Sequence, residues 1–220
     1  DENYEVKCWT VNGVEQPGKT GNTFTYAVSN DCTVAVELWG VKQDVTLQTG
    51  DGGNATVTDP ARYGETITIT ATPDAGYVVD TITVSGAETP LYQNTNKANG
   101  VQTAKYQITA GTTFEITFAE KPVVTFSAAN GSLTASGTVD GTADTKLTSG
   151  GYVDFGSAVT FTAAADSGYT LDGWYVDGEA IENTDLTYTT AALSDNVRVE
   201  VRFAAIADIP VSYAVNDETM

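Results

Sequence analysis

The residues that could carry chemistry in this 220-residue chain are two cysteines, a surplus of carboxylates and a set of aromatic side chains. The chain has no histidine, which excludes a Ser/His/Asp triad, a Cys/His dyad and an ordinary zinc site. Glycoside hydrolysis needs two carboxylates at a set separation in a cleft. The acids here are scattered over outward strand positions, such as Asp80, Glu115 and Glu200. We therefore expect no enzyme, no catalytic residue and no cofactor.

The two cysteines, Cys8 and Cys32, leave two interpretations open. In an extracellular chain, two cysteines favour a disulfide, and closing a loop of this length would stabilise the fold by roughly 3 kcal/mol. Against a bond, Cys32 falls on a core position of the internal repeat described below, whereas Cys8 aligns with Thr81 and Gly173. A candidate disulfide and two separate thiols both remain. A lysine–asparagine amide is disfavoured, because no lysine falls on a clear core position.

Two clusters rich in Asp, Gly and Thr, at 49–54 and 140–144, could offer oxygen ligands to calcium. Neither matches an EF-hand loop, and both lack its bidentate glutamate. We interpret them as solvated turns and expect no metal.

The charge balance excludes several partners. Twenty-nine acidic and ten basic side chains give a net charge of −19, which repels nucleic-acid backbones and anionic membrane surfaces. No apolar run is long enough to span a bilayer, so we expect no membrane insertion. Abundant Thr, Val and Tyr favour strands, and Gly, Asn and Asp supply tight turns. The composition predicts an all-β, or at least β-rich, protein.

Internal repeats decide how these elements are organised. Segments starting at Tyr4, Tyr77 and Tyr169 share the ungapped pattern Tyr-x-(Val/Leu)-x-x-(Trp/Ile)-x-Val-(Asn/Ser/Asp)-Gly. Each is followed, after a polar loop, by a strand-like segment of period two. These segments are Val34–Leu38, Phe114–Phe118 and Val199–Phe203. Motif order and spacing recur together, which indicates true repetition.

The repeats predict four divisions of the chain. Residues 1–43 are the C-terminal half of a repeat, 44–120 and 121–204 are full repeats, and 205–220 form a tail that resembles the start of a further repeat. The second full repeat is longer, and its extra residues near 136–151 look like a loop insertion. Short linkers are expected at 41–44, 120–122 and 205–210.

Within the repeat motif, the extra residue between the two apolar pairs reverses the side-chain alternation. A β-bulge in this strand would return both pairs to one core. Asn12-Gly13 and Asp177-Gly178 suit the two positive-φ positions of a type I′ hairpin turn. The recurrent aromatic residues are interpreted as core rather than as sugar-stacking platforms; they are Trp9, Trp174, Tyr4, Tyr77 and Tyr169.

The pattern Gly-Tyr-x-(Leu/Val)-x-x-Trp-x-Val-x-Gly, with a Val-x-Val-x-Phe strand after it, resembles the internalin B-repeat family, most closely its divergent branch. This resemblance implies tandem small β-grasp-like domains in an extended, extracellular array, often attached to the bacterial cell wall. It implies no catalytic residues. Better-studied members have a helix across the sheet, but here at most one helical turn fits, around 190–194.

Two functions remain open at this level. The first is a non-catalytic stalk or spacer, a monomeric segment of a longer bacterial surface or secreted protein. The second is an adhesion module for a host glycan or protein. Trp39, just past the last strand of the first repeat, is a candidate junction contact or ligand surface, and Tyr92 is a further candidate for that surface. The sequence specifies neither a ligand nor the orientation of successive repeats.

Overall fold

The computed structural model describes residues 1–207 and divides into two compact units, the first spanning Asp1–Glu120 and the second beginning at Lys121. Within residues 1–207 all regular structure is β-strand, so the predicted all-β class is confirmed. The β-grasp-like detail is not confirmed. No helix crosses a sheet in this part of the chain, and residues 190–194 lie outside regular structure. The tail at 205–220 lies largely outside the described residues.

The first unit contains a three-stranded sheet and one full repeat. The strands are β1 (Tyr4–Val11), β2 (Val14–Glu15), β3 (Val34–Gly40), β4 (Val45–Thr49), β5 (Gly53–Val57), β6 (Thr66–Pro73), β7 (Tyr77–Val84), β8 (Tyr92–Gln93), β9 (Gln102–Gln107) and β10 (Thr112–Glu120). Residues 1–43 form the sheet β2-β1-β3. The full repeat has two sheets, β4-β10-β7-β8 and β5-β6-β9. Its buried core draws on both, for example Ile69 of β6 and Phe114 of β10.

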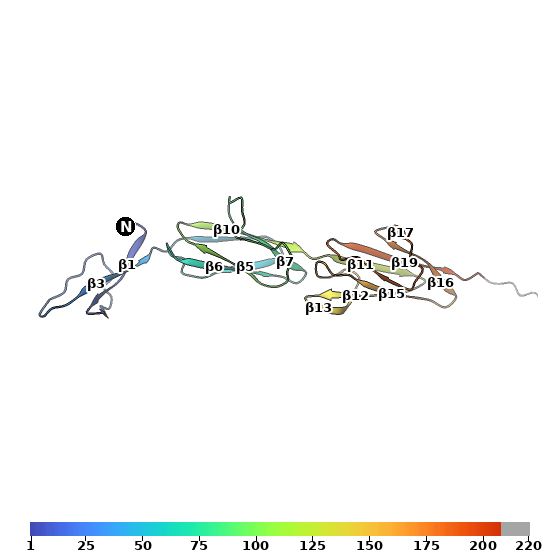
Figure 1. The fold of residues 1–220 in the computed structure, drawn as a ribbon, viewed down its shortest axis with the longest axis horizontal. Helices are drawn as coiled ribbons and strands as arrows, with labels where there is room; N and C mark the ends of the chain where they lie inside the picture. The colour runs from blue at the N-terminus through green and yellow to red at the C-terminus, as the bar shows by residue number, and fades with distance from the viewer. Residues whose placement is uncertain (208–220) are drawn as a thin grey trace, which may run out of the picture. The chain divides into compact units, whose positions relative to one another are not determined.

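The second unit repeats this two-sheet plan. Its strands are β11 (Val123–Ala129), β12 (Gly131–Val139), β13 (Thr142–Leu147), β14 (Gly151–Tyr152), β15 (Thr160–Ala165), β16 (Tyr169–Val176), β17 (Glu179–Ile181), β18 (Thr187–Thr189) and β19 (Val197–Ala205). The sheet β14-β11-β19-β16-β17 faces the sheet β13-β12-β15-β18, as Figure 1 shows. A second sheet thus covers the face that a helix covers in a β-grasp fold.

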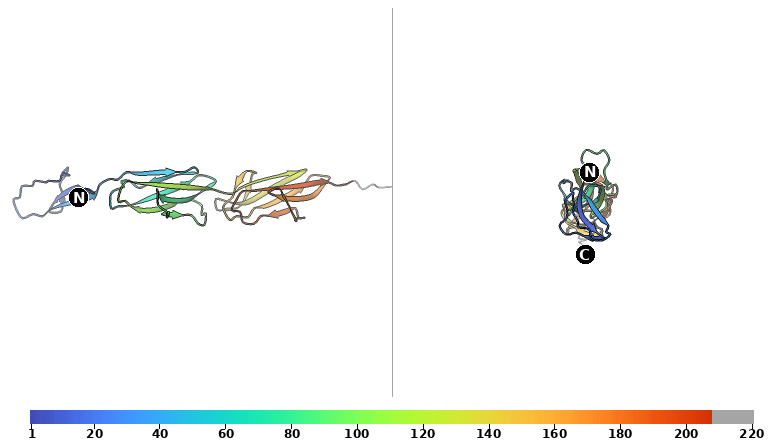
Figure 2. Two further views of the ribbon diagram at one scale, coloured as in Figure 1. Left: turned by 90° about the horizontal axis from the view of Figure 1, so that it is seen from above. Right: turned by 90° about the vertical axis from the view of Figure 1, so that its left-hand side faces the viewer.

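In each full repeat the first and last strands lie side by side and run in the same direction. β4 pairs in parallel with β10, from Val45 opposite Thr112 to Thr49 opposite Ile116. β11 pairs in the same way with β19. The other strands also run along the length of each repeat (Figure 2). The chain therefore enters a repeat at one end and leaves it at the opposite end.

The predicted β-bulge is present in all three copies of the motif. In β1 the register shifts by one residue between Val6 and Cys8, and in β16 it shifts between Leu171 and Gly173. In β7 the shift lies between Val79 and Thr81, which pair with consecutive residues of β10. The unpaired residues, Lys7, Asp80 and Asp172, occupy the same motif position and are charged. The bulge therefore keeps apolar residues on both sides of it in the core while a polar residue points out.

The two predicted type I′ turns are confirmed. Asn12 and Gly13 have φ of 52° and 78°, and Asp177 and Gly178 have φ of 51° and 89°. A third turn of this kind occurs at Asp140-Gly141, where φ is 49° and 80°. It joins β12 to β13, so the segment at 136–151 is a hairpin extension rather than an irregular loop.

The motif aromatics are core residues only where a second sheet covers them. Trp174 is 0% exposed, and its indole N–H donates to the Asp185 carbonyl oxygen at 2.9 Å. Ile82 occupies the same motif position in the first full repeat and is also fully buried. Trp9 is only half-buried, and Tyr4 is 41% exposed, so the core assignment is wrong for Tyr4. The reason is that residues 1–43 contain no counterpart of the second sheet.

Candidate functional site

No concentrated catalytic or metal site stands out in the part of the chain that the structure describes. Residues 1–207 contain no group of three or more His, Cys, Asp or Glu side chains placed to hold a metal ion. The cluster at 49–54 forms the turn between β4 and β5, where Gly52 has φ of 96°. Four features of these residues are described below: an aromatic pocket, a joint between repeats, two thiols and a buried lysine.

The aromatic pocket lies around Trp39 in the first unit. It is an open hollow of about 390 Å³, and its lining residues are Tyr4, Lys7, Leu38, Trp39, Gly40, Tyr63, Gly64 and Glu65. The rings of Tyr4 and Tyr63 meet edge to face, with centroids 5.5 Å apart. Trp39 remains 37% exposed. The pocket therefore combines aromatic and apolar side chains with one basic and one acidic residue, Lys7 and Glu65.

The joint between residues 1–43 and the first full repeat centres on Arg62. Its guanidinium carbon lies 3.8 Å from the centre of the Trp39 ring, a cation–π geometry. The same group donates to the Gly40 carbonyl oxygen at 2.8 Å and to the Glu5 carboxylate at 2.8 Å. Only 15% of the Arg62 side chain is exposed. Arg62 thus binds β1 and β3 of one repeat to the next; sequence reasoning singled out Trp39 but not its partner.

Backbone contacts complete this joint. The linker donates from Gln43 N–H to the Ala61 carbonyl oxygen at 2.8 Å, and the Val41 carbonyl oxygen accepts from Tyr63 N–H at 3.0 Å. Gly40 has to be glycine, because a Cβ there would lie 2.0 Å from the Tyr63 carbonyl oxygen. The expected linker at 41–44 is therefore an ordered, hydrogen-bonded segment.

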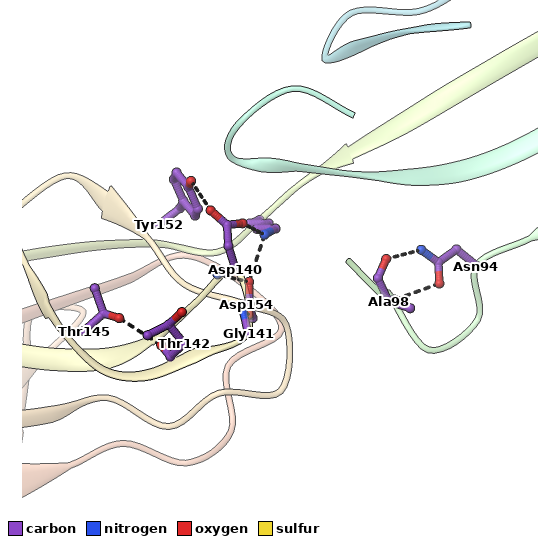
Figure 3. Close-up of polar contacts among 9 residues, drawn as sticks. Asn94, Ala98, Asp140, Gly141, Thr142, Thr145, Tyr152 and Asp154 are labelled. Atoms are coloured by element: carbon purple, nitrogen blue, oxygen red, sulfur yellow. Dashed lines mark hydrogen bonds and ion pairs between the residues drawn. The ribbon is translucent and has the colours of Figure 1, made fainter. Parts of the chain in front are cut away.

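Tyr92 lies on the short strand β8, opposite Ile82, and packs partly buried against the core of the first full repeat. Burial raises the pKa of its phenol. The neighbouring loop is held by Asn94, whose amide group exchanges two hydrogen bonds with the Ala98 backbone (Figure 3). Tyr92 does not line the pocket around Trp39. Its assignment as a ligand-surface residue stays a prediction.

Both cysteines are free thiols in the structure, Cys8 buried on β1 and Cys32 half-buried before β3. Burial raises the pKa of the Cys8 thiol, and the nearby Glu37 carboxylate adds to this effect. A buried thiol with a raised pKa is a poor nucleophile. Whether the two thiols bond in solution stays a prediction that a thiol assay can decide.

The second unit contains a polar cluster that sequence reasoning missed. Lys121 is 2% exposed, although no lysine had been assigned to the core. Its ammonium group lies 2.6 Å from Asp140 Oδ1 and 2.8 Å from Asp154 Oδ1. Asp154 also accepts hydrogen bonds from the N–H groups of Asp140 and Gly141, at 3.1 and 2.7 Å. The Tyr152 hydroxyl donates to Asp140 Oδ2 at 2.9 Å (Figure 3).

The electrostatics of this cluster favour charged groups. Burial lowers the pKa of Lys121, but hydrogen bonds to Asp140 and Asp154 and attraction to their charges together outweigh it, so the pKa is raised. The Lys121 ammonium lowers the pKa of Asp140. Asp140 stands at the tip of the β12–β13 hairpin, inside the Asp-, Gly- and Thr-rich cluster at 140–144 that was interpreted as a solvated turn. Its carboxylate forms an ion pair with Lys121 there. The Asp-Gly pair between strand-forming residues was the sequence signal for that tip.

Comparison with known proteins identifies the repeats. No curated protein matches the chain. No helix of the length and apolarity needed to cross a bilayer occurs in residues 1–207. Residues 43–117 and 123–207 each match the divergent InlB B-repeat domain, and together these segments cover well over half of the chain. The chain therefore belongs to the divergent internalin B-repeat family, whose modules are typical of bacterial surface proteins and generally non-catalytic.

Proposed function

We propose that this chain is a spacer segment of a bacterial surface protein and that its repeats resist tension. The observation that carries the proposal is the parallel pairing of the first and last strands in each full repeat. Because the chain enters and leaves a repeat at opposite ends, each copy adds its full length to a tandem array. Such a geometry suits a module that holds another domain away from a surface.

The same pairing suits a module under tension. A force applied to the two ends of the first full repeat pulls β4 and β10 in opposite directions along their common axis. The hydrogen bonds between these strands, which pair over five residues, are then loaded together in shear. Opening a hairpin from its end would load them one after another. A repeat loaded in shear is expected to resist a higher force than one that unzips.

The joint around Arg62 supports this function within residues 1–120. A flexible joint would let successive repeats fold back on one another and shorten the spacer. Here the linker is hydrogen-bonded to the following repeat, and Arg62 binds both sides of the joint. These contacts favour a fixed angle between the two repeats.

Single-molecule force spectroscopy on the full chain tests the proposal. The Asp44 carbonyl oxygen accepts from the Thr112 N–H, and the Gly50 N–H donates to the Ile116 carbonyl oxygen. Because every second residue of a strand faces the same neighbouring strand, the Gln48 N–H also faces β10. Gln48→Pro removes that donor and should lower the unfolding force of the first full repeat. Gln48→Ala, which keeps the N–H, should not. The second repeat provides an internal reference; an unchanged force in Gln48→Pro would refute the shear geometry.

The pocket around Trp39 favours adhesion as a second candidate function. Exposed aromatic rings beside polar groups are suited to the apolar faces and hydroxyls of a sugar. An oligosaccharide panel should then bind the full chain, and Trp39→Ala should remove the binding. Tyr26→Ala provides the control, because Tyr26 is 44% exposed and lies outside the pocket. Binding that survives Trp39→Ala, or no binding at all, would exclude this pocket as a glycan site.

A further inference from the structure

We propose that Lys121 and Asp154 join through an intramolecular amide bond, formed between Lys121 Nζ and the Asp154 side-chain carbon in the folded second unit. The amine nitrogen and the carboxyl group are in direct contact, with Nζ 2.8 Å from Oδ1. Both side chains are enclosed, at 2% and 11% exposure. The inference is independent of the spacer function and rests on the chemistry of this cluster alone.

Asp154 is placed as the electrophile. Its Oδ2 accepts from the Gly141 N–H at 2.7 Å, and its Oδ1 accepts from the Asp140 N–H at 3.1 Å. The Gly141 N–H is therefore placed to stabilise the negative charge that develops on Oδ2 when an amine adds to the carbon. Oδ1, which faces Lys121 Nζ, is then the oxygen that departs as hydroxyl.

Asp140 is placed as the proton carrier. Its Oδ1 lies 2.6 Å from Lys121 Nζ, and its other oxygen accepts from the Tyr152 hydroxyl at 2.9 Å. The Asp140 side chain is 58% exposed, so it can exchange protons with solvent while Lys121 cannot. A base within hydrogen-bonding reach of the nucleophile is the arrangement that activates a buried amine.

The reaction balances without an oxidant or a cofactor. A proton passes from the Lys121 ammonium to the Asp154 carboxylate, which leaves a neutral amine and a neutral carboxylic acid. The amine adds to the acid carbon and gives a tetrahedral intermediate whose negative oxygen, Oδ2, accepts from the Gly141 N–H. Asp140 takes a proton from the nitrogen and delivers it to the departing hydroxyl group. One C–N bond forms, one C–O bond breaks, and one water molecule leaves.

The fold supplies the driving force for this condensation. Hydrolysis competes with amide formation in water, but two groups held in contact react with effective molarities of roughly 10⁵–10⁸ M. The lysine that aligns with Lys121, in the linker before the first full repeat, shows the contrast. Lys42 pairs with Asp59 at 3.0 Å, but the two side chains are 58% and 68% exposed. The first full repeat therefore provides an uncrosslinked control in the same molecule.

Mass spectrometry of the intact, denatured full chain tests the proposal. The expected mass is that of the sequence minus one water molecule, with a branched peptide that joins the segments around residues 121 and 154. Lys121→Arg keeps the positive charge but cannot form the amide, and should restore the full mass. Asp154→Ala should do the same, and Asp140→Asn should slow or abolish the loss. Lys42→Arg should leave the water loss unchanged.

Two outcomes would overturn the proposal. A wild-type mass equal to the sequence mass would show that the cluster is an ion pair only. A water loss that persists in Lys121→Arg would show dehydration at another site, such as a cyclic imide at an Asp-Gly pair. Mild alkaline treatment distinguishes the two products, because an imide hydrolyses under these conditions and an amide does not. Neither outcome would affect the parallel strands on which the spacer function rests.

Discussion

Replacing Arg62 by alanine should loosen the joint between residues 1–43 and the first full repeat. The change removes a hydrogen bond from a charged group to the Gly40 carbonyl, worth about 1.5–3 kcal/mol. It removes a partly exposed cation–π contact with Trp39, worth about 0.5–1 kcal/mol. The ion pair with Glu5, whose side chain is 50% exposed, adds at most about 1 kcal/mol. Because neighbouring terms are not additive, we expect a loss of roughly 2–4 kcal/mol.

Amide hydrogen exchange on the full chain measures this loss. The N–H groups of Gln43 and Tyr63 donate across the joint, so their protection reports its opening. A loss of 2–4 kcal/mol corresponds to a fall in protection of roughly 30- to 900-fold. Gly40→Ala should produce a similar fall by a different route, because its Cβ would collide with the Tyr63 carbonyl oxygen.

Arg198→Ala provides the matched control. Arg198 is exposed and lies in the second unit, where its guanidinium group is 3.8 Å from a Glu200 carboxylate oxygen. Its removal should leave the protection of Gln43 and Tyr63 unchanged, and Arg62→Lys should give a partial loss because lysine lacks the planar fork of donors. If Arg62→Ala changed the protection of these two amides by less than threefold, Arg62 would not hold the joint.

Three further predictions concern packing and the thiols. Trp174→Ala should lower the free energy of unfolding of the second unit by roughly 3–5 kcal/mol. Urea unfolding, monitored by circular dichroism, should then occur in two steps, and the second unit should unfold first. Gly131→Ala should cost roughly 1–3 kcal/mol, since its Cβ would lie 2.5 Å from a carbonyl oxygen and a buried ring. Gly173→Ala should be near neutral in the same assay, since its Cβ would come no closer than 3.8 Å to the Tyr175 ring. In native protein an alkylating reagent should modify Cys32 before Cys8, because Cys8 is buried and Cys32 is half-buried. Denatured protein should yield two reactive thiols without reductant. A yield of no thiols would show a disulfide.

The repeat organisation and its local geometry could be predicted because they depend on residues close together in the chain. The motif spacing predicted a bulge, and Lys7, Asp80 and Asp172 are its unpaired residues. The Asn12-Gly13 pair predicted a turn from backbone sterics alone. Alternating apolar residues predicted strands but not how many sheets they form. The second sheet of each full repeat was therefore missed, and with it the reason why Tyr4 is exposed.

The functional features were harder to predict because they depend on contacts between distant residues. Lys121 lies in a linker before a proline, where no strand alternation assigns it to a core. Its burial depends on two carboxylates that follow 19 and 33 residues later. Arg62 likewise contacts Glu5, 57 residues away. Trp39 could be singled out because the aligned position in the next repeat is Ala119, and a departure from the repeat pattern is visible in the sequence itself.

The amide bond and the parallel strands together predict an unequal response of the two full repeats to force. Tension that enters the second unit at Lys121 would pass through the amide to Asp154, so the 33 residues from Pro122 to Asp154 would be shielded from extension. At roughly 3.5 Å per residue, the second repeat should release about 115 Å less chain than its sequence length allows. Lys121→Arg should restore the full release. Equal release by wild type and Lys121→Arg would contradict the cross-link while leaving the shear-loaded strand pair of the first full repeat in place.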